Sequence, residues 1–261
     1  MTLMVTNALE HQLPHEMQLH TYRIMYEVEG NHWWFQGRRR IISSFLEPLA
    51  REYAGQNLRM LDVGCGTGAN LELLSKYGQA EGVDVSEEAL AFCSSRGLRN
   101  VKKGRAEELP FDNESFNIVT ALDVVEHLDD DLLGLREMYR VLKPGGSAVL
   151  FVPAFMFLWG VQDDISHHRR RYTLPEIRSA VTEAGFRVER ATYINISFFL
   201  PILAGRLLMR LTGFRPASEN NLTISSLNGF LGSIFCAEAL LLRYMNFPFG
   251  VSAICIARRS E

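Results

Sequence analysis

The sequence lacks the features that would mark a nucleic-acid-binding, disulfide-stabilised or membrane-spanning protein. Its 27 Lys and Arg are outnumbered by 30 Asp and Glu, so the net charge is −3 and no general basic surface is expected. No segment approaches the ~18 uncharged apolar residues of a membrane span, and the first twenty residues do not resemble a secretory signal. The four cysteines have neither a CxxC pair nor metal-ligand spacing, which predicts reduced thiols in a cytoplasmic protein: Cys65, Cys93, Cys236 and Cys255.

What is present is a chain of 261 residues that can bury a full core, with one distinctive stretch from Met60 to Asn70. An apolar run over 58–63 stops in a loop with glycines at 64, 66 and 68, and a helical pattern begins near Ala69. Such a loop joins a buried parallel strand to a helix where backbone must come close to a ligand. The spacing is Gly-x-Gly-x-Gly, which differs from the Gly-x-Gly-x-x-Gly of a nicotinamide-binding turn.

Strand and helix patterns alternate along the rest of the chain. The expected strands cover 58–63, 80–85, a short stretch near 101, 116–122, 148–152, 186–194 and 250–258. The first five alternate with helices, which indicates right-handed βαβ units and a parallel sheet. The predicted fold class is therefore α/β, with a Rossmann-like sheet.

Two segments lie outside this alternation. Residues 1–54 form an expected N-terminal helical cover, loose over 1–20, with an aromatic and basic cluster from His32 to Arg40. That cluster is either a packed helix with solvated arginines or a lid over a flat or anionic ligand. The core is expected at 55–195, an apolar helical insertion at 196–249 and the last strand of the core at 250–261. The insertion has three interpretations: helices completing an acceptor site, a homodimer interface, or a peripheral membrane contact that reads a lipid-linked acceptor.

Two acidic residues stand at positions where a nucleotide ligand would need them. Asp84 ends the second strand about 20 residues after the glycine loop, where a carboxylate accepts both hydroxyls of a ribose, although a helix cap is the alternative. Asp62, inside the loop motif, either holds the loop or receives the ammonium group of the ligand.

Six motifs in this order resemble those of class I S-adenosylmethionine-dependent methyltransferases. They are Leu61–Gly68, Gly82–Asp84, Ala106–Phe111, Phe116–Val119, Glu126–Leu128 and Val141–Gly146. The resemblance covers roughly residues 55–195. It implies a seven-stranded sheet with a reversed last strand, and S-adenosyl-L-methionine as the cofactor.

The resemblance also implies roles for residues that match the family motifs. The glycine loop would border the amino-acid part of the cofactor, Asp84 would take the ribose, and Val85, Ala106 and Glu107 would lie by the adenine. The family often has Asp before that Ala, and this chain has Arg105. The segment 36–38 is similar to ubiquinone-biosynthesis O-methyltransferases, which makes Arg38, or else Arg39, the partner of the cofactor carboxylate. The full cofactor-binding set is Arg38, Asp62, Gly64, Cys65, Gly66, Gly68, Asp84, Val85, Ala106, Glu107, Leu122, Asp123 and His127.

Once the cofactor is bound, alignment and removal of the acceptor proton are what remain for the protein. Candidate catalytic residues are His127, His167, His168 and Tyr172. The segment 167–173 is either a solvated charge run before a helix capped by Thr173 or an acceptor or cofactor-lid loop, and similar methyltransferases carry His-x-Arg-x-Tyr there. Its three arginines would suit an acidic acceptor.

The segment Asp123–His127 resembles a pattern that binds Mg²⁺ in some small-RNA and quinone O-methyltransferases. The alternative is that Glu126 and His127 only support the fold, as in metal-free relatives. We therefore predict no metal ligand and keep Mg²⁺ as the alternative.

The sequence predicts a cytoplasmic enzyme that transfers a methyl group from S-adenosylmethionine to a small-molecule or lipid-linked acceptor, at oxygen. Methylation of RNA or protein, and a non-catalytic S-adenosylmethionine-binding protein, remain alternatives. No nucleic-acid partner is expected, whereas membrane association and a homodimer remain open. The glycine spacing argues against a nicotinamide oxidoreductase.

Overall fold

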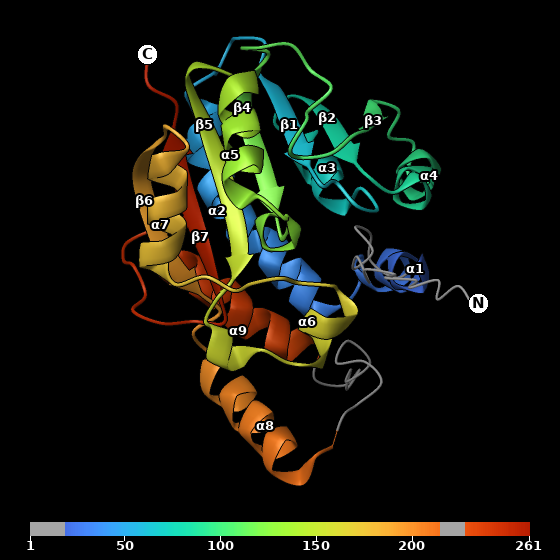
Figure 1. Cartoon of the computed structure of the whole chain (residues 1–261), viewed down its shortest axis with the longest axis vertical. Helices are drawn as coiled ribbons and strands as arrows, with labels where there is room; N and C mark the ends of the chain where they lie inside the picture. The colour runs from blue at the N-terminus through green and yellow to red at the C-terminus, as the bar shows by residue number, and fades with distance from the viewer. Residues whose placement is uncertain (1–18, 215–227) are drawn as a thin grey trace, which may run out of the picture.

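A computed structural model describes residues 19–214 and 228–261. The segment predicted to be loose, 1–20, lies outside the described residues except for its last two. Part of the 196–249 insertion, residues 215–227, also lies outside them. In the rest, a twisted sheet forms the centre and helices lie on both of its faces (Figure 1).

The sheet has seven strands in the order β3-β2-β1-β4-β5-β7-β6. Neighbouring strands from β3 to β5 pair in parallel, and β7 runs antiparallel to both β5 and β6, which confirms the predicted reversed last strand. The strands are β1 Arg59–Val63, β2 Gln79–Asp84, β3 Val101–Lys103, β4 Phe116–Leu122, β5 Leu142–Pro153, β6 Arg187–Ile194 and β7 Ser252–Arg258.

Burial explains why the central strands were readable as apolar runs. Every residue of β4 is buried, as are the last eight of β5. A parallel strand covered on both faces reads as a continuous apolar run, without the alternation of a half-exposed strand. The chain order reverses between β1 and β4, and open α/β sheets form their ligand crevice at the carboxyl ends of the strands beside such a point.

Four helices lie between the strands along the chain: α3 Ala69–Leu74, α4 Glu87–Ser95, α5 Asp131–Val141 and α7 Leu174–Glu183. The last three begin at residues whose side chains cap them, including the expected cap Thr173. Ser86 and Asp130 accept backbone N–H bonds at the starts of α4 and α5, and Thr173 forms a capping box with Glu176 at α7. The short helices η1 Val125–His127, η2 Met156–Leu158 and α6 Val161–Ile165 lie beyond β4 and β5.

The fifth strand begins earlier than expected. The sequence predicts it over 148–152, whereas β5 begins at Leu142 and includes the Pro-Gly-Gly turn of 144–146. Leu142 pairs with Phe116, and the register then shifts before Ser147 pairs with Ile118. The turn residues therefore form an irregularity within the strand, with Gly145 at φ +73°.

The remaining helices extend from the ends of the chain and from the insertion. They are α1 Leu19–Val28, α2 Trp33–Arg51, α8 Phe199–Thr212 and α9 Asn228–Leu241. The helix α9 packs on α2 on one side of the sheet, α5 and α7 cover the other side, and α8 projects from the end of the molecule to which β4 and β5 point (Figure 1). Among the described residues, none of the helices has the length and hydropathy needed to cross a membrane.

Candidate active site

The glycine loop after β1 places bare backbone at the edge of a cavity. Gly64 has φ +66° and Gly66 has φ +52°, a region that favours glycine. A Cβ on Gly64 would lie 2.5 Å from Cγ2 of Val124, whereas a Cβ on Gly66 would meet nothing within 4 Å. The first glycine is therefore required by close packing, and the second leaves open space on the cavity side.

Asp84 ties the end of β2 to this loop. One carboxylate oxygen accepts the backbone N–H of Gly66 at 2.8 Å, and the other accepts that of Ser86 at 2.9 Å. The residue is only 7% exposed and lines the cavity, as does Val85. A carboxylate held in this way keeps further lone pairs for ligand hydroxyls.

Arg38, on α2, carries buried donors that have no hydrogen-bond partner among residues 19–214 and 228–261. Its Nη1 lies 2.6 Å from a carboxylate oxygen of Asp123, and its guanidinium stacks 4.3 Å above the ring centre of Phe151. Its Nε and Nη2 are buried and donate no hydrogen bond to any described residue. Buried unsatisfied donors are costly, so this side chain is suited to an anionic ligand such as a carboxylate.

Asp62 offers a buried acceptor at the same edge of the sheet. One oxygen accepts the hydroxyl of Thr120 at 2.6 Å, and the other has no hydrogen-bond partner among the described residues. Burial raises the pKa of Asp62 to about 7, against the opposing effects of the Thr120 hydrogen bond and the charge of Arg38. A cationic ligand group would restore its ionised form.

Arg38, Asp84, Gly64 and Gly66 line one cavity of about 660 Å³ at the carboxyl ends of the strands, whereas Asp62 and Gly68 are not among its lining residues. The half in which the methyl donor would lie, called the donor half, also includes Leu122, Arg105, Ala106 and Glu107. Arg105 stands 3.4 Å from Glu107, so the residue found in place of the family Asp pairs with its neighbour. This arrangement fits a nucleoside that carries an amino acid, such as S-adenosylmethionine. It offers backbone amides, the Asp84 carboxylate for a ribose, the Arg38 guanidinium for a carboxylate and, beside the cavity, the buried Asp62.

The other half of the cavity is largely apolar and aromatic. It is lined from α2 by Trp33 and Trp34, from the approach to α8 by Phe198, and from α8 by residues that include Ile202 and Met209. The Trp33 and Phe198 ring centres lie 4.8 Å apart, and Trp34 packs 5.3 Å from Phe235 of α9. The aromatic cluster of α2 thus joins the insertion at the cavity wall, where Arg206 also contributes a buried guanidinium.

The candidate catalytic residues separate into two groups. His127 and His168 line the cavity, with ring centres 4.7 Å apart, whereas His167 and Tyr172 are not among its lining residues. The Tyr172 hydroxyl donates to Asp131 at 2.6 Å, and burial, followed by that bond, raises its pKa. His167 has φ +55° and a buried Nε2 without a partner among the described residues.

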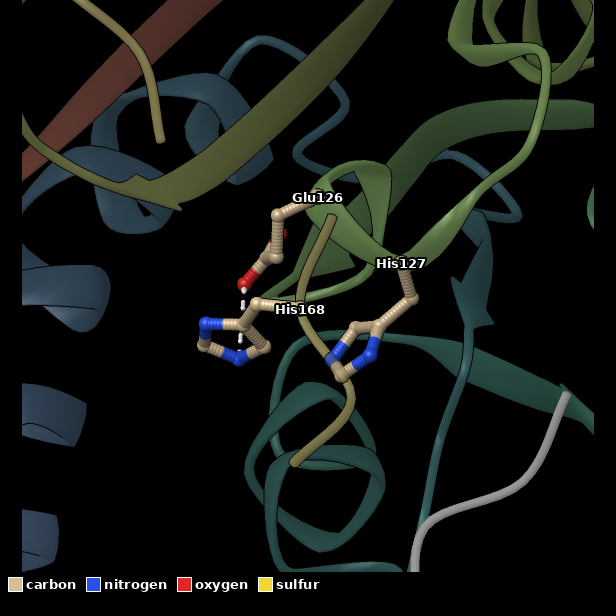
Figure 2. Close-up of side chains that lie close together, drawn as sticks. All are labelled: Glu126, His127 and His168. Carbon is tan, nitrogen blue, oxygen red and sulfur yellow. Dashed lines mark ion pairs between the residues drawn. The ribbon is translucent and has the colours of Figure 1, made fainter. Parts of the chain in front are cut away.

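Glu126, His127 and His168 form a compact group beside the cavity (Figure 2). One ligand-type atom from each lies within 4.8 Å of the others, and Nε2 of His168 lies 3.9 Å from an oxygen of Glu126. Burial, with the charge of Asp123, raises the pKa of Glu126. Burial and the neighbouring histidines lower the pKa of His127 to about 3, so its imidazole is neutral at physiological pH. Asp123, the first carboxylate of the Mg²⁺-type pattern, is engaged by Arg38.

The three arginines after His168 are all paired within the chain. Arg169 lies 2.8 Å from Asp129, Arg170 lies 3.1 Å from Asp131, and Arg171 lies 2.8 Å from Asp163. They therefore fix the loop against η1 and α6, and their charges give no separate argument for an acidic acceptor.

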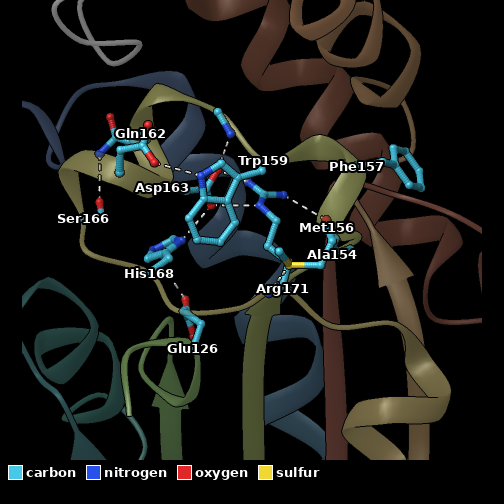
Figure 3. A network of polar contacts seen from close by, with 12 residues as sticks. Glu126, Ala154, Met156, Phe157, Trp159, Gln162, Asp163, Ser166, His168 and Arg171 are labelled. Atoms are coloured by element: carbon cyan, nitrogen blue, oxygen red, sulfur yellow. Dashed lines mark hydrogen bonds and ion pairs between the residues drawn. The ribbon is translucent and has the colours of Figure 1, made fainter. Parts of the chain in front are cut away.

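Sequence reasoning missed the role of two buried residues at the site. Asp163 is hydrogen-bonded to both His168 and Arg171 (Figure 3), and its spacing of five residues from His168 is the available signal in the sequence. Arg206 is buried at the cavity, and no local pattern in the sequence indicates that it turns inward.

Comparison with known proteins agrees with this geometry. A model of the methyltransferase domain matches residues 61–150. The "Uncharacterized methyltransferase YcgJ" of Bacillus subtilis is 32% identical over 182 residues, which cover 65% of this chain and 71% of that protein. A "Probable S-adenosylmethionine-dependent methyltransferase" of Mycolicibacterium smegmatis is 28% identical over 69% of each chain.

Two further matches cover different parts of the chain. A demethylmenaquinone methyltransferase of Staphylococcus aureus is 41% identical over 36% of this chain, which spans 42% of that protein. Among solved structures, the methyltransferase in complex with the Trm112 activator of Haloferax volcanii has a TM-score of 0.57 at 18% identity. It covers 93% of this chain and 94% of that one, which shows the shared fold. The chain belongs to the class I S-adenosylmethionine-dependent methyltransferases.

Proposed function

We propose that the enzyme methylates a hydroxyl oxygen of a largely apolar small molecule or lipid-linked acceptor. The observation that carries the proposal is the two-part cavity: a polar half suited to the cofactor adjoins an apolar half walled by α2 and α8. S-adenosylmethionine supplies an electrophilic methyl group. The residues proposed to hold it are Arg38 at the carboxylate, Asp62 at the ammonium, the glycine loop along the backbone of the amino-acid part, and Asp84 at the ribose.

The acceptor half contains groups suited to an uncharged oxygen nucleophile. Its aromatic walls bury apolar surface, and His127 and His168 stand where a proton can be accepted. A hydroxyl, unlike an amine, holds its proton at neutral pH and gains most from a nearby base. The name of the demethylmenaquinone relative supports a quinone-type small molecule as one acceptor class.

The helix α8 supports an acceptor with an apolar tail. Four of its leucines face solvent: Leu200, Leu207, Leu208 and Leu211 are between 48% and 85% exposed. Its opposite side lines the cavity, and Arg210 turns back to donate to the carbonyl of Phe157 at 2.8 Å. The same helix thus exposes leucines on one side and lines the acceptor half with the other. Such a helix is suited to bind a lipid surface, from which an amphiphilic acceptor would enter the cavity.

Methylation of RNA or protein gains no support from the site. The basic residues of 32–40 and 167–171 do not form one exposed basic face, since Arg38 turns into the cavity and Arg169 to Arg171 pair with Asp129, Asp131 and Asp163. The proposal therefore stays with a small or lipid-linked acceptor.

The test is methyl transfer from labelled S-adenosylmethionine to matched acceptors: catechol, a long-chain alkylcatechol presented in lipid vesicles, and a long-chain alkylaniline. We expect the alkylcatechol to be methylated with the lowest KM and the aniline to remain unmodified. Leu207→Glu combined with Leu211→Glu should raise the KM for the vesicle-borne acceptor only. Leu133→Glu, at a 44% exposed leucine on α5, is the matched control. Preference for the aniline, or an identical KM for all variants, would contradict the proposal. If the wild type is a dimer and the variant with Leu207→Glu and Leu211→Glu is a monomer, the exposed leucines of α8 form a self-association surface instead.

A further inference from the structure

Asp163, which lies in α6 shortly before His167 and His168, is held in one orientation by several hydrogen-bond donors. It is 1% exposed, and one of its oxygens accepts the Nε–H of Arg171 at 2.8 Å. The other oxygen accepts Nη2 of Arg171 at 3.1 Å and the backbone N–H of Gly160 at 2.7 Å. Arg171 is itself fixed, because its Nη1 donates to the carbonyl of Ala154 at 2.9 Å. The carboxylate therefore cannot turn without breaking several bonds.

This fixed carboxylate contacts one ring nitrogen of His168. Nδ1 lies 2.8 Å from the Asp163 oxygen that also accepts Nε of Arg171 (Figure 3). Burial alone would raise the pKa of Asp163, but the His168 hydrogen bond and the Arg171 charge outweigh it and lower the pKa to about 2. An ionised carboxylate only accepts hydrogen bonds, so Nδ1 carries the proton and Nε2 of the neutral ring has a free lone pair.

The second ring nitrogen, Nε2, is directed toward Glu126. Its nearest acidic neighbour is Glu126, whose oxygen is 3.9 Å from Nε2, beyond hydrogen-bonding distance. The charged or titratable groups facing the ring are thus Asp163 with Arg171 behind it, Glu126, and the neutral His127. Since His168 lines the cavity, Nε2 is open to a ligand there.

We propose that Asp163 is a positioning residue, which holds His168 in the tautomer whose Nε2 accepts the proton of an acceptor hydroxyl. This inference rests on the proposed O-methylation. As the O–H bond breaks, its electron pair stays on the oxygen for the new bond to the methyl carbon, and the proton moves to Nε2. The methyl–sulfur bond of S-adenosylmethionine breaks at the same time, its electron pair goes to the sulfur, and neutral S-adenosylhomocysteine leaves. The imidazolium that forms is balanced by the Asp163 carboxylate and later releases the proton to water.

The proposal makes Asp163→Asn informative. In either orientation the amide NH2 faces one N–H of Arg171. At the Oδ2 position it would also face the backbone N–H of Gly160, which cannot lose its proton, whereas at the Oδ1 position it faces Nδ1 of His168, which can. The amide nitrogen is therefore expected at the Oδ1 position. An amide N–H requires an acceptor there, which moves the imidazole proton to Nε2 and removes the base. Asp164→Asn is the matched control, because Asp164 lies next to it on α6, is exposed, and accepts only the indole N–H of Trp159 in the described structure.

The direct experiment is proton–nitrogen NMR of the histidine side chains in the protein without ligands, with His168 assigned by comparison with His168→Gln. We expect the His168 proton on Nδ1 in the wild type and in Asp164→Asn, and on Nε2 in Asp163→Asn. A wild-type proton on Nε2, or no change in Asp163→Asn, would overturn the proposal. This measurement needs no acceptor. It can therefore overturn the role of Asp163 while O-methylation holds, and it can support that role even if O-methylation is wrong.

Turnover of the alkylcatechol gives the second readout. General-base catalysis contributes roughly 10²–10⁴-fold, so Asp163→Asn should lower kcat at least ~100-fold with cofactor affinity unchanged. In a His168→Ala background the same change should cost almost nothing further, whereas a purely structural role would cost the same in both backgrounds. Equal losses in the two backgrounds would overturn the proposal. So would loss of activity in EDTA that a divalent cation restores, because Nε2 would then be a metal ligand.

Discussion

Buried polar atoms without partners gather where the cofactor is proposed to bind. Asp62 keeps one free carboxylate oxygen, and Arg38 keeps two free N–H groups, all without hydrogen-bond partners in the described part of the chain. Leaving such groups unsatisfied costs about 1–3 kcal/mol each, more when they are charged. A zwitterionic ligand whose carboxylate meets Arg38 and whose ammonium meets Asp62 would remove both costs, which favours the amino-acid part of S-adenosylmethionine.

The proposed contact between Asp62 and the ammonium group of the cofactor predicts that cofactor affinity depends on pH. With a pKa of about 7 in the free protein, its carboxyl is mostly protonated at pH 5.5, and an ammonium ligand requires the ionised form. Binding must therefore release a proton at low pH. We expect the affinity for S-adenosylhomocysteine to rise by up to ~10-fold per pH unit between pH 5.5 and 7, then to level off.

Calorimetry in buffers of different ionisation enthalpy measures this proton release directly. At pH 5.5 the wild type should release close to one proton, and at pH 7.5 much less. Asp62→Asn should bind more weakly and show neither the release nor the slope below pH 7. An unchanged slope in Asp62→Asn would assign the titration to another group.

At the scale of the element, α2 is the helix on which the acceptor half depends. It carries Arg38 and both cavity tryptophans, and it packs on α9. The two helices meet at Gly37, which is buried in α2. A Cβ added there would lie 2.2 Å from Cδ1 and 2.6 Å from Cβ of Phe235. Since the second contact is close to the α9 backbone, the helix itself would have to shift.

Gly37→Ala is therefore expected to destabilise the protein, by about 1–3 kcal/mol as for other overpacked cores. Gly232→Ala in α9 is the control, because its added Cβ would meet only the Cβ of Trp33 at 3.9 Å and alanine favours a helix. Thermal unfolding should give a lower Tm for Gly37→Ala and an equal or higher Tm for Gly232→Ala. Equal Tm values for both variants would show that the α2–α9 contact is not tight.

The elements were predictable where local chemistry determines them. Buried strands such as β4 read as apolar runs, and the caps at Ser86, Asp130 and Thr173 mark where helices begin. The start of the fifth strand was placed at 148 instead of Leu142, because pairing of Leu142 with Phe116 extends β5 through the turn at 143–146. The outward face of α8 was not predictable, since an apolar stripe normally faces the core and nothing local shows which side is covered.

The site residues were predictable only where their partners lie nearby or in a family motif. The glycine loop, Asp84 and Arg38 do line one cavity, as expected. The sequence suggested an acidic acceptor for Arg169, Arg170 and Arg171. Their pairing was not predictable, because the partners of the first two, Asp129 and Asp131, lie about 40 residues earlier, at the start of α5. Asp163 contacts His168 only after a turn with His167 in a left-handed conformation, which no residue pattern indicated.

At the scale of the whole molecule, the strand ends and the loops after them supply most of the donor half of the cavity, to which α2 adds Arg38, and the added helices supply the acceptor half. The strands end at the glycine loop and Asp84, while α2, α8 and the approach to α8 bring aromatic and apolar walls from distant parts of the chain. The acceptor preference is therefore expected to reside in the N-terminal helices and the insertion, and the choice of methyl donor in the core.

The central claim is that the methyl group is transferred to the oxygen of an apolar acceptor. The most direct measurement incubates the enzyme with tritium-labelled S-adenosylmethionine and a total cell extract, then separates lipids, small polar molecules, RNA and protein. We predict label in the organic-soluble fraction as a methyl ether. We predict no label with Asp84→Ala, which removes the carboxylate proposed to bind the ribose of the cofactor. Label in RNA or protein, or an organic product methylated at nitrogen or carbon, would contradict the account.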